Sequence, residues 1–405
     1  MRFKVGYSLY PIKNTEEQPK MKFSTILNQI LQFLPQSEFE AVIKKFKADR
    51  YVKYFKTKSL FVVHLYAQIR KKDSLRDIVC GLEQHQSKWY HLGLEKIKRS
   101  TISDANNRVP YLVYESLFYA MLKKCNRLTP NTSFKFKNPL YALDSSIIDL
   151  CLSVFDWAKF RRTKGGLKLH CLFDLKTQIP AFNVITTAKE ADVKVAKETT
   201  LPLIPDSIVT FDRAYIDFSL FQAYQDAKVF FVTRTKENLR FEFLGQHDIP
   251  KKKGLQFDQT VQIKNPKQRK KYPGKLRLIG YFDHDTNKTY LFLTNNFKLA
   301  AITITQIYKA RWQIELFFKW IKQNLKIKTF LGTSKNAVLS QIWVAMIYTL
   351  LLAYIKFQTK FSFSILKLAR MIQEALFFRQ HLIDILGLKS SKPPNIRGSS
   401  QLSFC

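Results

Sequence analysis

The spacing of apolar residues changes once along this chain, near residue 130, and this change constrains the fold more than any other feature. From residue 23 to residue 121 apolar residues recur at helical spacing, and no run reads as a good strand. Pro130 to Pro139 has the composition of a linker. Beyond it, strands are predicted at residues 140–143, 167–173, 181–186, 207–211 and 229–233, and helices at residues 189–199 and 219–227. The sequence therefore predicts a helical part followed by an α/β part with a mixed sheet.

A third pattern interrupts the α/β part. Residues 238–296 contain four strand candidates separated by polar turns, which predicts a β-rich insertion. Its segment 251–275 holds nine Lys or Arg against one Asp, and we interpret it as a solvated face that can also touch phosphate. From residue 300 onward the spacing is helical again.

These patterns predict a multidomain α+β protein, in keeping with a length of 405 residues, which exceeds one average domain. We expect an all-α N-terminal domain, an α/β domain in two pieces with a helical C-terminus, and a β-rich insertion between the pieces. The expected bounds are a flexible tail at 1–20, the helical domain at 21–129, the α/β domain at 130–237 and 297–388, the insertion at 238–296 and a disordered tail at 389–405.

The net charge of the chain limits the classes of molecule that it is expected to bind. The chain has 67 Lys and Arg against 31 Asp and Glu, a formal net charge of +36. A protein with that excess repels itself unless an anionic partner neutralises it, which favours nucleic acid or a membrane surface. The alternative is a protein from a generally basic proteome.

The cysteines and the N-terminus favour a reducing, cytoplasmic location. The basic N-terminus lacks the apolar segment of a signal peptide. The five cysteines are scattered, and no pair has metal-ligand or disulfide spacing. They are Cys80, Cys125, Cys151, Cys171 and Cys405.

One uncharged run, residues 337–355, approaches the length of a transmembrane helix. It contains Ser340, Gln341 and Thr349 and directly follows an amphipathic helix. We therefore predict a buried core helix and no membrane partner, with a membrane span as the alternative.

Two helices of the N-terminal part could form a helix-turn-helix. One opens at Ser74 and the other near Thr101, and the second presents Asn106, Asn107 and Arg108. Asn can bind adenine and Arg can bind guanine in the major groove, so these types suit base reading. Any surface helix can carry the same residues, and that alternative stays open.

Two aspartates, Asp144 and Asp212, each follow a short apolar run at the predicted C-terminal end of a strand. Strand ends are where α/β sheets display catalytic groups. Turn formation and helix capping explain an aspartate there equally well.

A more specific pattern lies on the helix predicted at residues 304–326. Tyr308, Arg311, Glu315 and Lys322 follow at steps of three, four and seven residues, which places them on one face. An apolar stripe with Ile307, Ile314 and Phe317 runs beside them and is expected to pack on the sheet. A solvated face with an Arg–Glu pair is the alternative.

The spacing Tyr308-(2)-Arg311-(3)-Glu315-(6)-Lys322 resembles the Y-R-E-K signature of bacterial insertion-sequence transposases of family four, a DDE group. Leu143-Asp144-Ser145-Ser146 looks like the first-Asp motif of that family. Phe211-Asp212-Arg213-Ala214-Tyr215 is similar to its second-Asp motif, where Gly more often precedes the Tyr. The segments at residues 74–77 and 100–106 also resemble the N-terminal domain of one branch. The resemblance covers residues 22–356.

The resemblance implies an RNase H-like fold for the α/β domain and DNA binding for the helical domain. It implies a transposase that cuts the terminal inverted repeats of its element and joins them to target DNA, as a homodimer in a bacterial nucleoid. Asp144, Asp212 and Glu315 would hold two magnesium or manganese ions, since hard oxygen ligands suit these metals. Tyr308, Arg311 and Lys322 would contact phosphates. The alternatives are an inactive DNA-binding copy and an RNase H-like nuclease without strand transfer.

Overall fold

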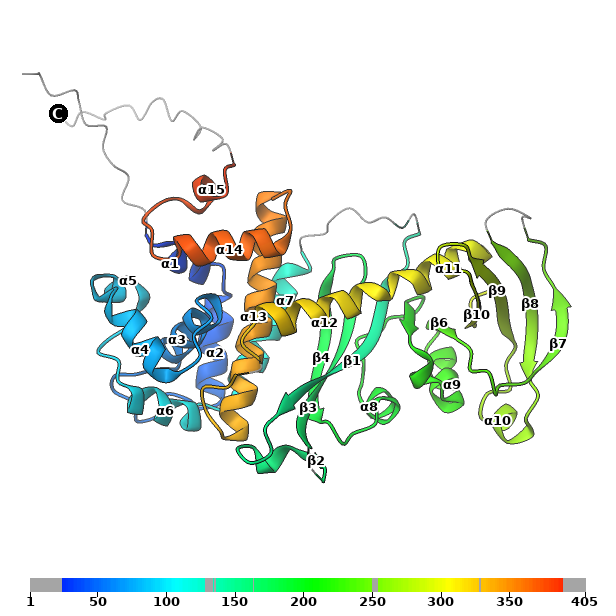
Figure 1. Cartoon of the computed structure of the whole chain (residues 1–405), viewed down its shortest axis with the longest axis horizontal. Coiled ribbons are helices and arrows are strands. Elements are labelled where there is room, and N and C mark those ends of the chain that lie inside the picture. The colour runs from blue at the N-terminus through cyan, green and yellow to red at the C-terminus, as the bar shows by residue number, and fades with distance from the viewer. Residues whose placement is uncertain are drawn as a thin grey trace, which may run out of the picture.

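The computed structural model describes residues 24–127, 134, 136–162, 164–249, 254–327 and 329–388. The predicted tails at 1–20 and 389–405, and residues 130–133 and 135 of the predicted linker, lie outside this part of the chain. Figure 1 shows that helices from both ends of the chain gather at one end of the molecule, while a long twisted sheet extends to the other.

The helices fall into two groups, those of the bundle and those that cover the sheet. The bundle contains α1 (Ile26–Gln32), α2 (Gln36–Lys45), α3 (Thr57–Ile69), α4 (Leu75–Glu83), η1 (Gln86–Lys88), α5 (Trp89–Leu92), α6 (Arg99–Arg108), α7 (Tyr111–Cys125), α13 (Lys335–Thr359), α14 (Ile365–Ala375) and α15 (Leu382–Ile385). The remaining helices are η2 (Asp156–Ala158), α8 (Asp192–Glu198), η3 (Arg213–Tyr215), α9 (Phe218–Asp226), α10 (Pro266–Lys271), α11 (Ala301–Ala310) and α12 (Trp312–Asn324).

Ten strands form one mixed sheet in the order β2-β3-β1-β5-β6-β10-β9-β8-β7, with β4 also paired to β3. Strands β1, β5 and β6 are parallel, and the other pairings are antiparallel. The strands are β1 (Leu140–Leu150), β2 (Lys159–Arg161), β3 (Lys164–Asp174), β4 (Ile179–Thr187), β5 (Ile208–Phe211), β6 (Phe230–Arg234), β7 (Phe241–Gln246), β8 (Leu255–Ile263), β9 (Leu276–Asp283) and β10 (Lys288–Thr294).

The β-rich segment at residues 238–296 continues the main sheet, because β10 pairs with β6. A buried ion pair stabilises this extension. The Arg277 guanidinium of β9 donates to both carboxylate oxygens of Asp258 on β8, at 2.8 and 2.6 Å. Arg277 also donates to the carbonyl oxygens of Asn296 and Leu299, which precede α11. The extension is therefore tied to the start of the helix that carries Tyr308.

Along each central strand, the side chains of successive residues point to opposite faces of the sheet. Leu143 and Phe211 belong to the core beneath α8 and α9, whereas Ala142 and Ile208 belong to the core that includes α11 and α12. Phe221 of α9 stacks on Phe231 at 4.1 Å on the first face. On the second face, the ring of Phe317 on α12 lies 4.9 Å from that of Phe173 on β3.

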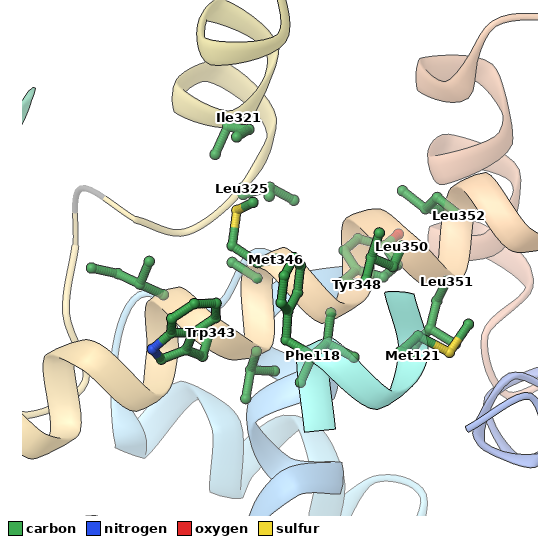
Figure 2. Close-up of a cluster of buried hydrophobic side chains, with 14 of the residues drawn as sticks. Phe118, Met121, Ile321, Leu325, Trp343, Met346, Tyr348, Leu350, Leu351 and Leu352 are labelled. Carbon is green, nitrogen blue, oxygen red and sulfur yellow. The ribbon is translucent and has the colours of Figure 1, made fainter. Parts of the chain in front are cut away.

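Helix α13 is the centre of the bundle. It contacts α3, α6, α7 and α14, and its neighbours therefore come from both ends of the chain. Figure 2 shows Trp343 and Met346 of α13 close to Phe118 of α7, with Leu325 after α12 on the opposite side. By length and composition α13 could cross a membrane. However, 94% of an apolar 18-residue stretch of this helix is buried inside the protein. This burial agrees with the predicted core helix.

Three local predictions need correction. The single helix predicted at 304–326 is two helices, α11 and α12, joined at Arg311, where the Ile314 amide bonds to the Arg311 carbonyl three residues back. Strand β1 does not end at Asp144 but continues to Leu150, because it pairs with β3 along its whole length. The helix expected to open near Thr101 begins two residues earlier, at Arg99.

Candidate active site

Sheet register places Asp144 and Asp212 side by side. The parallel pairing of β1 with β5 ends at Leu143 opposite Phe211; Asp144 is the next residue of β1, and Asp212 is the first residue after β5. Since Leu143 and Phe211 point to the α8–α9 face, the following residues point to the α11–α12 face. Both carboxylates therefore lie beneath the helices that carry the Y-R-E-K residues.

The environment of Asp144 disfavours its charged form. The pKa of Asp144 is raised to about 6, mainly by burial and to a smaller extent by the nearby carboxylates of Glu315 and Asp212. Two contacts act against this rise: the Ser145 backbone N–H, which donates to Oδ1 at 2.8 Å, and the Arg311 guanidinium. These influences show that the three predicted carboxylates share one electrostatic site.

Arg311 lies between two of the three carboxylates. Its Nη2 donates to Oε1 of Glu315 at 2.6 Å, and its Nη1 is 3.6 Å from Oδ2 of Asp144. The Arg311 side chain is only 12% exposed, so both interactions are poorly screened by solvent. Its position at the junction of α11 and α12 directs the guanidinium toward β1 and not into solvent.

Tyr308 and Lys322 lie on either side of this centre. The ring of Tyr308 packs on Phe292 of β10 at 5.1 Å, and the Arg311 guanidinium lies 5.4 Å from the same ring. Burial raises the pKa of Tyr308, Arg311 lowers it, and the charge of Asp212 raises it. Lys322 follows two turns after Glu315 on α12 and is half-buried. Tyr308 and Arg311 thus lie close to the carboxylates. Lys322 lies on α12, the helix that also carries Glu315.

A cavity of about 650 Å³ opens beside the site, between α11 and the sheet. Asp212, Tyr308 and Arg311 form one wall, and Arg234 and Tyr290 form another. The Arg234 guanidinium lies 4.6 Å from the Tyr290 ring. Arg234 was missed by the sequence analysis, although it directly follows the strand predicted at residues 229–233.

A metal ion would need a rearrangement of these side chains. Within the described residues, no group of three His, Cys, Asp or Glu is arranged to hold a metal ion. The donor chemistry still fits a hard divalent cation, because Asp144, Asp212 and Glu315 offer only carboxylate oxygens. In this structure the Arg311 guanidinium interacts with two of these three residues, Asp144 and Glu315.

The N-terminal residues predicted to read bases lie elsewhere and have structural contacts. Asn106 is buried, and its Oδ1 accepts a hydrogen bond from Nε2 of His64 on α3 at 2.7 Å. Its backbone oxygen accepts from Asn336 of α13. Asn107 is exposed, but its Oδ1 accepts from Ser334, the residue that caps α13. This end of α6 is therefore docked on α13, and the Asn106 amide is not accessible to a base.

Arg108 holds a neighbouring loop. Its guanidinium donates to the carbonyl oxygens of Ala48 at 2.6 Å and Phe55 at 2.9 Å, and lies 3.7 Å from Asp49. The two helices expected to form a helix-turn-helix are also separated. Residues 84–98, with η1 and α5, lie between α4 and α6, whereas a helix-turn-helix uses a turn of roughly 3–4 residues.

Comparison with known proteins gives matches to two parts of the chain. Residues 135–351 match the family described as "Transposase DDE domain", and residues 22–95 match a "Domain of unknown function (DUF4372)". The chain is 32% identical over 308 residues to "Putative transposase y4zB" of Sinorhizobium fredii, covering 75% of this chain and 83% of that protein. It is 30% identical over 278 residues to "Probable transposase for insertion sequence element IS5377" of Geobacillus stearothermophilus, covering 66% and 70%. A "Putative transposase for insertion sequence element IS4SA" of Synechocystis is 24% identical over 267 residues, covering 64% and 72%.

The family match contains the central strands and all three carboxylates, and it spans more than half of the chain. This chain therefore belongs to the transposases that carry a DDE domain. Within that class it is a DNA transposase of the insertion-sequence family-four type, an enzyme that cleaves nucleic acid.

Proposed function

We propose that this transposase cuts DNA at the terminal inverted repeats of its own element, freeing 3′-hydroxyl groups, and joins them to target DNA. In this proposal Asp144, Asp212 and Glu315 are the catalytic residues. The observation that carries it is the convergence of the three carboxylates on one face of the sheet, where Asp212 and Glu315 both raise the pKa of Asp144.

Asp144, Asp212 and Glu315 would hold two magnesium or manganese ions. When bound, such ions would polarise the scissile phosphate, prepare the attacking oxygen and stabilise the leaving oxygen. The protein itself supplies the cations around the DNA. Arg311 and Lys322 would pair with phosphates beside the scissile one, and Tyr308 would donate to a phosphate oxygen.

Arg311 would exchange partners during this process. Without DNA its guanidinium neutralises Asp144 and Glu315. A DNA phosphate offers the same guanidinium an equivalent anionic partner, which would free both carboxylates for metal ions. Loading of metal and of DNA would therefore favour each other, a coupling that must be reciprocal.

The domain layout is part of the proposal. We assign residues 130–237 and 297–388 to an RNase H-like catalytic domain, with 238–296 as a β-rich insertion and 21–129 as a DNA-binding region. Support comes from the strand order β4-β3-β1-β5-β6, in which three antiparallel strands are followed by two strands parallel to β1. A homodimer acting at the nucleoid would hold the two element ends together.

A strand-transfer assay tests this function. The full chain is incubated with a labelled duplex that carries the element end, a supercoiled target plasmid and Mg²⁺, and products are resolved by length. We expect a nick at the element end and a labelled strand joined to the plasmid. Cleavage without joined product would identify a nuclease, and binding without cleavage would identify an inactive copy; either result would overturn the proposal.

A further inference from the structure

Two tyrosines are unusually exposed in the loop between α2 and α3. Tyr51 is 89% exposed and Tyr54 is 72% exposed. They line a groove of about 610 Å³ together with Lys53, Lys96, Lys98 and Arg108, and we call this the tyrosine groove. Tyrosine is enriched at interfaces, and a contiguous exposed apolar patch marks an interaction site.

The loop that carries these tyrosines is firmly anchored. Asp49 accepts hydrogen bonds from both the backbone N–H and the hydroxyl of Thr57, each at 2.7 Å. Arg108 bonds to the carbonyls of Ala48 and Phe55, on either side of the tyrosines, and both of these residues are buried. The tyrosines are therefore displayed by a fixed loop. Tyr51 even adopts a left-handed φ of +60°, which a bulky residue rarely does.

The groove has the charge of a site for a polyanion. Four basic side chains line it against two acidic ones, Glu95 and Asp104. The loop adds Lys47, Arg50 and Lys56, while its one acid, Asp49, is occupied by Thr57 and Arg108. The Arg50 guanidinium lies 4.8 Å from the Tyr51 ring and donates to its hydroxyl at 2.8 Å. Cations and aromatic faces are thus interleaved along one surface.

We propose that the tyrosine groove binds duplex DNA and is the DNA-contact surface of the N-terminal region. The lysines neutralise backbone phosphates, and the two tyrosines pack against sugars and base edges. Arg108 is a positioning residue that holds the loop. The inference rests on the proposed function, because the charge of the groove is matched to the DNA on which a transposase acts. The proposal assigns a DNA-contact surface to the N-terminal region, of which residues 22–95 match a domain of unknown function.

The first test compares exposed tyrosines of the full chain. Tyr51→Ala combined with Tyr54→Ala should weaken binding of an element-end duplex at least about tenfold, since removing two aromatic side chains from an interface has an effect of this order. Tyr90→Ala is the matched control, because Tyr90 is also 89% exposed and does not line the groove. Binding is followed by fluorescence anisotropy at one fixed salt concentration, and thermal unfolding verifies that all variants fold alike.

The second test measures phosphate contacts. Replacing Lys53, Lys96 and Lys98 with Gln should reduce the slope of log affinity against log salt by about 2–3, since each phosphate contact contributes about 0.9. Lys71→Gln, an exposed lysine outside the groove, should leave the slope unchanged.

Three outcomes would overturn the proposal: unchanged DNA affinity in the tyrosine variant, an equal loss in Tyr90→Ala, or an unchanged salt slope in the lysine variant. If the tyrosine variant binds DNA normally but no longer self-associates in sedimentation, the groove is a protein–protein contact. Because both tests measure binding, their result does not depend on cleavage, and a wild-type protein that binds but does not cut would contradict only the proposed function.

Discussion

The guanidinium of Arg311 lies 3.6 Å from the carboxylate of Asp144, at the same time as it donates to Glu315. The arginine of the Y-R-E-K pattern, one helical turn before Glu315, thus connects two of the three proposed metal ligands. Without DNA it neutralises them, and in the complex we expect it to neutralise phosphate.

Replacing Arg311 with Ala should therefore tighten metal binding in the absence of DNA and impair cleavage in its presence. A hydrogen bond to a charged group contributes about 1.5–3 kcal/mol, so Mn²⁺ affinity should rise at least about tenfold. The measurement belongs near pH 8, because loss of Arg311 raises the pKa of Asp144 further and protonation would mask the effect. Isothermal titration with Mn²⁺ gives the affinity. Weaker metal binding by the variant at pH 8 would show that Arg311 does not compete with metal.

The carboxylates themselves can be tested with isosteric changes. Asp144→Asn, Asp212→Asn and Glu315→Gln should each lower cleavage about a thousandfold, because metal stabilisation of the transition state amounts to several kcal/mol. DNA affinity should not fall, since each change removes a negative charge. Asp149→Asn is the control, because Asp149 is an exposed acid on the same strand. If one of the three variants cleaves DNA as fast as this control, the residue replaced in that variant is not a metal ligand.

The sheet was the most predictable part of the fold. The strands expected at 207–211 and 229–233 agree with β5 and β6 to within one residue, since short apolar runs bounded by turns are local signals. The adjacency of Asp144 and Asp212 was not predictable, because it depends on the register of two strands separated by about 60 residues of chain. Likewise, the true end of β1 depends on its pairing with Gly165 and Gly166 of β3.

The burial of Asn106, which the sequence analysis expected to read bases, has a long-range cause. Asn106 and Arg108 have residue types that suit base reading, but their partners are Asn336, more than 200 residues away, and a loop about 50 residues earlier. Hydrophobic periodicity gives no information on such contacts. Conversely, the exposed Tyr51 and Tyr54 follow no periodic pattern, and only the structure shows that they line a groove.

The shared bundle leads to a prediction about fragments. Helices α3, α6 and α7 pack on α13, so residues 24–127 alone would expose much of their apolar surface. We expect this fragment to lack a cooperative thermal transition by circular dichroism. A chain in which a flexible linker joins 24–127 to 335–388 restores α13 and should unfold cooperatively. A cooperative transition in the fragment alone would show that the N-terminal helices form an independent domain.

The ion pair between Asp258 and Arg277 should stabilise the whole extension of the sheet. Both side chains are buried, and Asp258→Ala would leave the Arg277 charge without its partner. Such a change costs about 3–5 kcal/mol. Chemical denaturation should detect this loss, and Asp285→Ala, at an exposed acid of the same extension, should have little effect. A loss below about 1 kcal/mol would mean that solvent or other groups solvate Arg277 well.

Protonation of His64 should make the bundle sensitive to acid. Burial lowers the pKa of His64 from its ordinary value of 6.5 to about 4, and its hydrogen bond to Asn106 only partly offsets this. Between these values the unfolded chain binds a proton that the folded chain excludes, so the contribution of His64 to stability is full above pH 6.5 and falls as the pH drops toward 4. From pH 7 to pH 5 the free energy of unfolding should lose roughly 2 kcal/mol relative to His64→Gln, which cannot titrate. Urea denaturation of both proteins at the two pH values isolates this difference from other titrating groups. A difference between wild type and variant that stays constant with pH would place His64 in a solvated environment and contradict its burial against Asn106.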